Sequence, residues 1–322
     1  MLALHIGAPK AGSSSLQRYF TDHRDALRKR GIHYPDSGCV PSLALRAHHN
    51  LGYEVSTGNR RKFNPSWGDW SSALKEIGEH GVISTESLFR LPPHPIRKVR
   101  QYTRDFDVRV VAFLRRQDLA LESAYNQLAR FGRVSESIEE YWRRNRHLFD
   151  YAVYIDRWGT AFDNLIVVPF EAPWITNGVA VEMLRRCGFD GLPLEERRMN
   201  TKAGLKSILA ISRVLAACRG SLGDDYSLSA VAARQIVTHF RNDPEEVFDY
   251  RLVTPALSDE ILGFCQASNE RLGLAFAPPD RNPQGGRAAT LTRADEDWLD
   301  AYVAKLELMG RQQEPGRPMD GS

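Results

Sequence analysis

The residues best suited to chemistry lie close to the N-terminus, in segment 7–15, which reads GAPKAGSSS. Its glycines let the backbone approach a ligand closely, its lysine supplies a mobile positive charge, and its serines supply hydroxyl donors. Because an apolar run precedes the segment and a helical pattern follows it, the free N–H groups of a helix start converge on one point. The preferred ligand of such a site is a phosphate or a similar oxyanion. The residues expected to line it are Pro9, Lys10, Ala11, Gly12, Ser13, Ser14 and Ser15.

This segment is close to the Walker A motif of nucleotide-dependent kinases but departs from it at the lysine. The motif reads GxxxxGK[ST]. Gly7 and Gly12 have its spacing, but Ser13 stands at the lysine position and Lys10 precedes the second glycine. A kinase on this loop would also need a carboxylate for magnesium, whereas the run at 108–114 is followed by two arginines. The structural alternative is a serine-capped helix after a tight turn, with Lys10 in solvent.

A second candidate group follows the run VRVVAFL at 108–114, which has the β-branched character of a central parallel strand. Arg115 comes directly after this run, and Ser123 lies on a helix expected over 118–131. Ser123 is about a turn and a half beyond Asp118, the expected N-cap, so its hydroxyl can face the same point as Arg115. Alternatively, Arg115 forms an ion pair with a nearby carboxylate and Ser123 is an ordinary helix residue.

Strands and helices alternate along the first half of the chain, which predicts a parallel sheet with right-handed crossovers. We therefore expect an α/β, P-loop-like three-layer fold with a central parallel sheet flanked by helices. Ligands of open α/β sheets bind beyond the carboxyl ends of the strands, and Lys10, Glu86 and Arg115 all lie at such ends. Strands are expected over 2–6, 31–35, 82–84, 108–114 and 165–170, and helices over 13–30, 70–79, 95–106, 118–131, 138–146 and 151–162.

The second half of the chain is expected to be mostly helical. We expect one domain over 1–276, made of an α/β core at 1–175 and a helical extension at 176–276. A linker and a C-terminal helix are expected at 277–310. The tail 311–322 lacks aromatic residues and is expected to be disordered. Helices are predicted over 178–187, 202–219, 228–241, 258–272 and 294–309.

The composition argues against several classes of protein. The 322-residue chain has a net charge of +3 at pH 7, too small for a nucleic-acid-binding footprint. Its four cysteines form no CxxC pair, so we expect neither a metal site nor a disulfide framework, which fits a reducing cytoplasm. No apolar run approaches the ~20 residues of a membrane span. The first strand begins at the initiator methionine and leaves no room for a signal peptide, so a cytoplasmic location is expected.

The segment HIGAPKAGSSSLQ resembles the 5′-phosphosulfate-binding loop of sulfotransferases that use 3′-phosphoadenosine 5′-phosphosulfate (PAPS), which typically reads P-K-[ST/A]-G-[ST]-[ST]-x-L. The segment VVAFLRRQDLALESAYNQ resembles the 3′-phosphate-binding element of the same family. There an arginine ends a central strand and a serine lies eight residues later, as Arg115 and Ser123 do. Many members have proline two residues after the arginine, where this chain has Gln117. The loop positions that fit are Pro9, Lys10, Gly12, Ser13, Ser14 and Leu16.

The resemblance implies transfer of a sulfuryl group from PAPS to a hydroxyl or amine of a carbohydrate or glycoconjugate, without a metal, with Lys10 stabilising the leaving phosphate. The stretch ISTESLF resembles the E-[KS]-[ST]-x-x-[YF] segment in which glycan sulfotransferases carry a catalytic glutamate. Glu86 is therefore the expected general base. His48 and His49 are the competing bases, since other branches of the family use a histidine. The structural alternative is an ion pair between Glu86 and Arg90.

The segment 36–70 mixes arginines with tryptophans, which favours a carbohydrate acceptor, although a solvated loop pinned by its tryptophans would look the same. Residues 200–206, NTKAGLK, are the candidate for a loop that caps the nucleotide. Two rival functions stay open from the sequence: a nucleotide-dependent P-loop kinase and a non-catalytic nucleotide- or sulfate-binding module. The kinase would prefer ATP with magnesium, and the module would have no need of Glu86.

Overall fold

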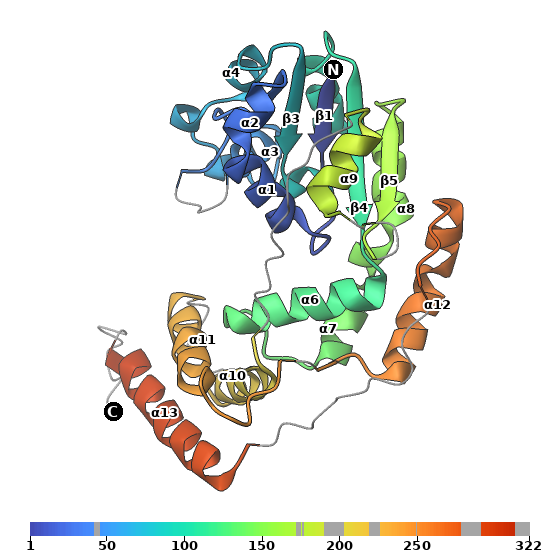
Figure 1. Cartoon of the computed structure of the whole chain (residues 1–322). Helices are drawn as coiled ribbons and strands as arrows, with labels where there is room; N and C mark the ends of the chain where they lie inside the picture. The colour runs from blue at the N-terminus through green and yellow to red at the C-terminus, as the bar shows by residue number, and fades with distance from the viewer. Residues whose placement is uncertain are drawn as a thin grey trace, which may run out of the picture. The chain divides into compact units, whose positions relative to one another are not determined.

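The structure of the chain is a computed structural model (Figure 1). It describes residues 1–41, 46–171, 175, 177–189, 203–218, 226–248, 250–277 and 291–312. The expected linker after residue 277, the tail from residue 313 and residues 200–202 of the candidate capping loop lie outside the described residues.

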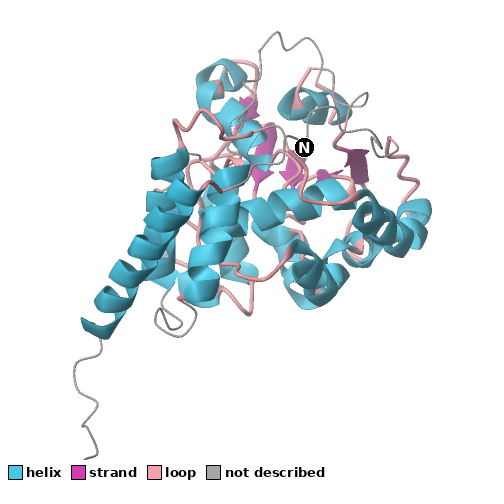
Figure 2. Ribbon diagram, turned by 90° about the horizontal axis from the view of Figure 1, so that it is seen from below, coloured by secondary structure: helices cyan, strands magenta, loops and turns pink. Residues whose placement is uncertain are grey.

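The chain divides into two compact units, each assembled from separated segments. The first unit comprises Met1–Ala120, His147–Asn200 and Glu260–Pro278, and the second comprises Leu121–Arg146, Thr201–Asp259 and Pro279–Ser322. This division differs from the continuous segments expected from the sequence, because the chain leaves the first unit within one long helix and returns to it later. All described strands belong to the first unit, and the described elements of the second are helices (Figure 2).

A parallel sheet of five strands, in the order β2-β3-β1-β4-β5, forms the centre of the first unit (Figure 1). The strands are β1 (Leu2–His5), β2 (Ile32–His33), β3 (His80–Ser84), β4 (Val108–Leu114) and β5 (Leu165–Pro169). β1 pairs with both β3 and β4, so that Leu4 stands opposite Ile83 on one side and Val110 on the other. Every residue of β1 is buried, as expected for a parallel strand covered on both faces. The structure confirms the α/β fold class.

The helices of the first unit are α1 (Ser13–Asp22), α2 (Arg24–Arg28), α3 (His49–Val55), α4 (Trp70–Lys75), α5 (Pro93–Tyr102), α8 (Tyr151–Gly159), α9 (Val179–Arg186) and most of α12 (Pro255–Arg271). After β1 the chain forms the edge strand β2, returns to form β3 between β2 and β1, and then crosses β1 to form β4 and β5 on the other side. Right-handed crossovers therefore place α1 on one face and α5 and α8 on the opposite face, which agrees with the packing of α1 against α9 and of α5 against α8.

The direction of winding reverses at β1, the first strand. In open α/β sheets, ligands bind beyond the carboxyl end of the strands at such a reversal. The topology thus places the loop after β1 where the fold class usually holds its ligand.

Two regions differ in detail from the expected elements. The helix expected over 13–30 is broken into α1 and α2 at His23, whose φ of −107° and ψ of 12° leave the helical range. The segment 36–70, expected to be irregular, contains α3 and two short 3₁₀ turns, Arg60–Lys62 and Pro65–Trp67.

Trp70 anchors this segment to the core of the first unit. Its side chain is fully buried, its indole N–H donates to the carbonyl of Leu51 at 3.1 Å, and its ring stacks on Tyr102 with the centroids 6.0 Å apart. The basic residues of the 3₁₀ turn Arg60–Lys62 are exposed. Trp70 is therefore a core residue, as the structural alternative for this segment predicts.

The second unit has a core of its own. Its helices are α6 (Gln117–Arg130), which begins in the first unit, α7 (Ile138–Asn145), α10 (Leu205–Ala217), α11 (Tyr226–Phe240) and α13 (Arg293–Gln312). α10 packs against α11 and α13 through buried apolar side chains, among them Ile211, Val214, Ile236, Phe240 and Leu299.

Candidate functional site

The loop between β1 and α1 has left-handed backbone conformations at three positions: Gly7 (φ 69°), Lys10 (φ 72°) and Gly12 (φ 84°). For a residue with a Cβ atom this conformation costs roughly 1–2 kcal/mol. Within the described part of the chain, Lys10 is the one non-glycine residue with a positive φ. Strain of this kind persists at functional sites, where the surrounding structure holds it. The loop therefore keeps a lysine where glycine would be more stable.

α1 begins directly after this loop without a side-chain cap. Its N-cap is Gly12, and its first turn contains no acidic residue. The structural alternative predicted that a serine side chain caps this helix. The N-cap is instead Gly12, which has no side chain to do so. The Oγ atom of Ser13 is buried and has no hydrogen-bond partner among the described residues. An uncapped helix start beside an unsatisfied buried hydroxyl is what an oxyanion site requires.

The same loop lies against the ends of two other strands. A Cβ atom at Gly7 would lie 2.8 Å from the Cβ of Glu86. One at Gly12 would lie 2.5 Å from Cε2 of Phe170 and 2.8 Å from Cγ2 of Val179. Only glycine fits at these two positions, because a side chain would collide. Since Glu86 follows β3 and Phe170 follows β5, the loop after β1 brings three strand ends together.

Arg115, at the end of β4, adds the fourth strand end. Its Nη1 donates to the carbonyl oxygen of Lys10 at 3.4 Å, and its guanidinium lies 5.6 Å over the ring of Phe170. Its Nε lies 3.9 Å from Oε1 of Glu171, and its carbonyl accepts a hydrogen bond from the Tyr151 hydroxyl at 2.9 Å. Arg115 is therefore held beside the loop, and its long contact with Glu171 is the ion pair considered in the structural alternative.

The Glu171 carboxylate lies mostly out of solvent beside Arg115. Its Oε1 accepts the backbone N–H of Arg116 at 2.9 Å, while its Oε2 is buried and has no hydrogen-bond partner within the described ranges. Burial raises the pKa of Glu171, and the hydrogen bonds and neighbouring arginines offset this only in part. Glu171 thus orients the residues that follow β4.

Arg116, the next residue, has a different role. Its guanidinium is buried and donates to both carboxylate oxygens of Asp118 at 2.7 and 3.0 Å and to the carbonyl of Ala277 at 2.7 Å. Asp118 was expected to be the N-cap of the following helix. That helix, α6, instead begins at Gln117, and the Asp118 carboxylate binds Arg116. Of the two arginines that end β4, only Arg115 lies at the loop.

Ser123, the expected partner of Arg115 at the 3′-phosphate, lies on α6 and is half-buried. The boundary between the two units falls within α6, and Ser123 belongs to the second unit while Arg115 belongs to the first. Their joint site stays a prediction.

Glu86 starts a short 3₁₀ turn, Glu86–Leu88, directly after β3. Its Oε2 accepts a hydrogen bond from Nε2 of Gln17 at 3.1 Å, and its Oε1 lies 3.8 Å from Nε2 of His49. The side chain is 37% exposed, so a substrate can reach it. Arg90 does not form the ion pair proposed as the alternative, because its guanidinium donates to the carbonyl of Leu148 and lies over the ring of Tyr154.

The two candidate histidines differ sharply although they are adjacent. His48 is fully buried, its Nδ1 accepts the backbone N–H of Ser84 at 3.1 Å, and its Nε2 donates to the carbonyl of Pro35 at 3.1 Å. Burial lowers the pKa of His48 to about 4. With both ring nitrogens bonded, His48 has no lone pair for a substrate. His49 reaches Glu86 instead, with its Nδ1 2.9 Å from Oγ1 of Thr85.

Gln17 is the residue of this site that the sequence analysis missed. Its side chain is buried and also lies 3.4 Å from the hydroxyl of Ser84. That hydroxyl lies 2.8 Å from Nδ1 of His5, a fully buried histidine whose pKa burial lowers to about 4. The available signal was its position on α1, four residues after Ser13 and three before the core residue Phe20, which puts a polar side chain on the buried face.

Lys206, the last residue of the candidate capping loop, belongs to the second unit and is buried in an ion cluster. Its Nζ lies 2.7 Å from Asp243, 3.1 Å from Glu245 and 2.9 Å from Asp295. Burial disfavours the charge of Lys206, but these hydrogen bonds outweigh it and raise the pKa above its ordinary value. Lys206 therefore has a structural role and does not reach a nucleotide.

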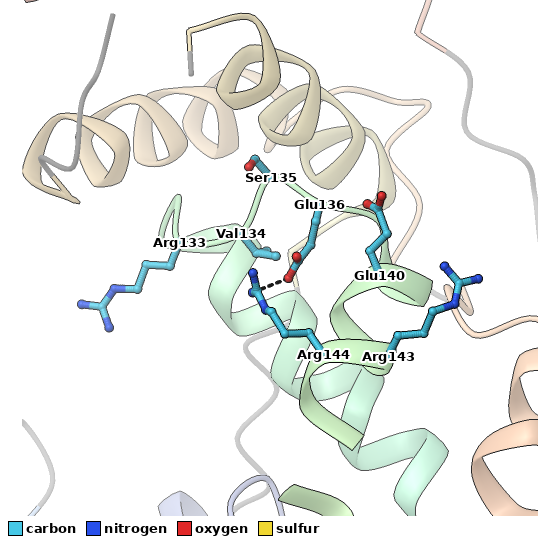
Figure 3. A pocket seen from close by; sticks show the side chains of 7 residues that line it. All are labelled: Arg133, Val134, Ser135, Glu136, Glu140, Arg143 and Arg144. Atoms are coloured by element: carbon cyan, nitrogen blue, oxygen red, sulfur yellow. Dashed lines mark hydrogen bonds and ion pairs between the residues drawn. The ribbon is translucent and has the colours of Figure 1, made fainter. Parts of the chain in front are cut away.

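A cavity of about 650 Å³ opens on the second unit, between α6 and α7 (Figure 3). Its lining carries both basic and acidic side chains, and Arg144 pairs with Glu136 at 2.5 Å. Glu140 also closes the N-terminus of α7 in a capping box with Ser137. The helix start beside this cavity is capped, unlike the uncapped start found after β1. Its lining consists of Arg133, Val134, Ser135, Glu136, Glu140, Arg143 and Arg144.

Over the described ranges, no group of three or more His, Cys, Asp or Glu side chains is placed to hold a metal ion. None of the helices described is both long enough and apolar enough to cross a membrane.

Comparisons with known proteins find distant similarities. No family model matches the sequence. An "uncharacterized protein" of Archaeoglobus fulgidus is 28% identical over 140 residues, which is 41% of this chain and 37% of that protein, so the match spans little more than a third of the relative. Among solved structures, the crystal structure of a sulfotransferase from Alicyclobacillus acidocaldarius is similar with a TM-score of 0.40 and 19% identity, covering 67% of this chain and 95% of that one. A similarity of this size does not by itself identify an activity.

Proposed function

We propose that the chain is a sulfotransferase that moves a sulfuryl group from PAPS to an acceptor on a carbohydrate or glycoconjugate. The observation that carries the proposal is that residues at the ends of β3 and β4 meet the loop that follows β1. Lys10 lies in that loop, Arg115 from β4 donates to its carbonyl, and Glu86 from β3 touches Gly7. Cations, uncapped amides and a carboxylate thus meet at the point where the fold reverses its winding.

The loop after β1 suits the 5′-phosphosulfate of the donor. The first amides of α1 and the hydroxyl of Ser13 can donate to its oxygens, and Lys10 can neutralise the charge that grows on the bridging oxygen. As in phosphoryl transfer, a loose in-line displacement depends mainly on positioning and charge stabilisation. Lys10 would be the residue that stabilises the departing adenosine 3′,5′-bisphosphate.

Arg115 is the candidate ligand of the 3′-phosphate, with Ser123 as its expected partner. A planar guanidinium suits a phosphate because it can donate two parallel hydrogen bonds. Glu171 and Phe170 hold the guanidinium in place beside the loop. Arg115 and Arg116 follow β4 directly. A kinase would need a magnesium-binding carboxylate at this strand end, so the two arginines argue against that function.

Glu86 is the proposed general base. Its carboxylate is open to solvent and lies next to the donor loop, so an acceptor can bind between the base and the sulfuryl group. His48 is excluded from this role by its two hydrogen bonds and complete burial.

The experiment is incubation of the purified chain with ³⁵S-labelled PAPS and a panel of monosaccharides, polysaccharides and glycolipids, with product and adenosine 3′,5′-bisphosphate measured together. We expect acceptor-dependent release of the bisphosphate, which should fall by roughly 100-fold in Lys10→Met and be strongly reduced in Glu86→Gln. Phosphoryl transfer from ATP with magnesium would establish the kinase instead. Binding of PAPS without turnover, unchanged in Glu86→Gln, would establish the non-catalytic module.

A further inference from the structure

Glu86 and His49 face each other across a short gap beside the donor loop. Oε1 of Glu86 and Nε2 of His49 are 3.8 Å apart. This is too long for a direct hydrogen bond, which needs about 2.7–3.2 Å between nitrogen and oxygen. It is short enough for one oxygen atom to lie within hydrogen-bond distance of both atoms.

We propose, building on the sulfotransferase function above, that Glu86 and His49 together bind the attacking oxygen of the acceptor and thereby select hydroxyl acceptors over amines. In this arrangement the acceptor oxygen donates its proton to Oε1 of Glu86 and accepts a hydrogen bond from Nε2 of His49. His49 is then the partner of the base rather than a competing base.

Glu86 is fixed so that only one carboxylate oxygen is available. Nε2 of Gln17 donates to Oε2 at 3.1 Å, and Gln17 itself is buried on α1, the helix that starts at the donor loop. Gly7 packs against the backbone of Glu86 on the other side. Gln17 is therefore a positioning residue that leaves Oε1 to face His49.

The side chain of His49 is also held in place by its neighbours. Its Nδ1 lies 2.9 Å from Oγ1 of Thr85, a buried residue whose backbone N–H donates to the carbonyl of His5. The ring of His49 stacks on Tyr53 with an interplanar angle of 23°. α3 approaches the 3₁₀ turn Glu86–Leu88 so closely that a Cβ atom at Gly52 would overlap the hydroxyl of Ser87.

The surroundings also select the tautomer of His49. Oγ1 of Thr85 accepts the backbone N–H of Ser87 at 3.3 Å and lies 2.7 Å from the Ser87 hydroxyl, so its own proton can go to Nδ1 of His49. A proton on Nε2 then faces the Glu86 carboxylate, whereas the other tautomer would direct a lone pair at that negative charge. The favoured tautomer therefore carries its proton on Nε2.

The step balances with these two residues and the donor. A lone pair of the acceptor oxygen attacks sulfur, and the bond from sulfur to the bridging oxygen of the 5′-phosphate breaks. The electron pair of that bond leaves with adenosine 3′,5′-bisphosphate, whose new charge lies near Lys10. The acceptor proton passes to Oε1 of Glu86, and the His49 N–H holds the second lone pair of the acceptor oxygen.

This geometry distinguishes a hydroxyl from an amine. A hydroxyl oxygen has two lone pairs, one to attack and one to accept from His49. A neutral primary amine has a single lone pair, so it cannot attack sulfur and accept from His49 at once. An amine would leave the Nε2–H of His49 facing a second N–H donor, which is unfavourable at a partly buried site.

The test compares matched alcohol and amine acceptors, beginning with methyl α-glucoside and its 6-amino-6-deoxy analogue at pH 9, where part of the amine is neutral. For each hydroxylated compound that accepts ³⁵S from PAPS, the wild type should favour it over its amino analogue by roughly 100-fold or more in kcat/KM. His49→Phe should lower turnover of the alcohol roughly tenfold or more and bring the two acceptors close to parity. His49→Gln, which restores an N–H donor, should recover part of the selectivity.

The exposed His94 supplies the control, because His94→Gln should leave both rates unchanged. Amines that react as fast as the matched alcohols, or a His49→Phe enzyme with wild-type rates and selectivity, would overturn the inference while leaving the sulfotransferase intact. Absence of transfer from PAPS to every acceptor would count against the proposed function itself.

A second readout needs no acceptor. Nitrogen-15 NMR of the His49 imidazole should show the proton on Nε2 at neutral pH, with a shift of the signal in Glu86→Gln. A proton on Nδ1 in the wild type would contradict the proposed hydroxyl site.

Discussion

The carboxyl edge of the sheet in the first unit and the Lys206 cluster in the second place cationic side chains in opposite circumstances. Lys206 is enclosed by Asp243, Glu245 and Asp295, which together satisfy its ammonium group. At the sheet edge, Lys10 sits in a strained loop beside an uncapped helix and Arg115, whose contact with a carboxylate is 3.9 Å long. A positive charge enclosed by carboxylates stabilises the fold, whereas cations grouped beside an uncapped helix start mark a place for an anion.

The first prediction tests the structural side of this comparison and has the largest expected effect. Lys206→Met leaves Asp243 and Asp295 without their buried partner, which should destabilise the second unit by about 3–5 kcal/mol. Hydrogen exchange of α10 and α11 would report the loss locally. Lys305→Met, at an exposed position of α13, is the matched control. Equal protection in the two variants would show that the cluster contributes little.

The second prediction concerns His48, a buried side chain whose two ring nitrogens hydrogen-bond to backbone groups. Burial lowers the pKa of His48 to about 4 from an ordinary value of 6.5; His49 adds to this lowering, while the backbone hydrogen bonds and Glu76 offset it in part. Because the unfolded chain takes up this proton first, stability is full above pH 6.5 and falls as the pH drops towards 4, by about 3 kcal/mol. Urea unfolding at several pH values should show this slope, and it should be smaller in His48→Asn. An unchanged slope in that variant, with His94→Gln as control, would contradict the assignment.

The third prediction tests the functional side. Lys10→Met should lower turnover by roughly 100-fold, about 2.7 kcal/mol of transition-state stabilisation, while the melting temperature changes little. Steady-state kinetics with PAPS together with a thermal melt would separate the two effects. A variant that loses stability rather than turnover would place Lys10 with Lys206 as a structural residue.

The fourth prediction has the smallest expected effect, and that effect is a gain in stability rather than a loss. Lys10→Gly removes the Cβ atom from a residue with φ of 72° and should stabilise the chain by about 1 kcal/mol while it abolishes the same charge. Chemical unfolding of Lys10→Gly beside Lys10→Met checks this difference. If Lys10→Gly is less stable than Lys10→Met, the lysine side chain contributes to folding.

Much of the fold could be predicted from the sequence because its strands are buried on both faces. The run 108–114 is continuous and apolar, and β4 has the expected bounds. Parallel strands then dictate that the residues after them share one edge, which is why Lys10, Glu86 and Arg115 could be placed together. The conformation of the insertion 36–70 could not be predicted, since its short helices depend on contacts such as that of Trp70 with Tyr102.

Which of two adjacent residues serves the site also lay beyond the sequence. Arg115 and Arg116 are identical in type, and only the partners Asp118 and Ala277 decide which one is locked away. The same holds for His48 and His49. Hydrogen bonds with distant segments bury His48 and leave His49 beside Glu86. Helical spacing puts Gln17 on the buried face of α1, but its partner Glu86 follows a distant strand, so the sequence did not show what Gln17 would bind.

The most direct test of the central claim is a calorimetric titration of the wild-type chain with adenosine 3′,5′-bisphosphate, adenosine 5′-monophosphate and ATP with magnesium. The account predicts that the bisphosphate binds at least roughly tenfold more tightly than either of the others, and that Arg115→Ala removes this preference for a 3′-phosphate. Tighter binding of ATP with magnesium, or equal binding of the bisphosphate and the monophosphate, would contradict it.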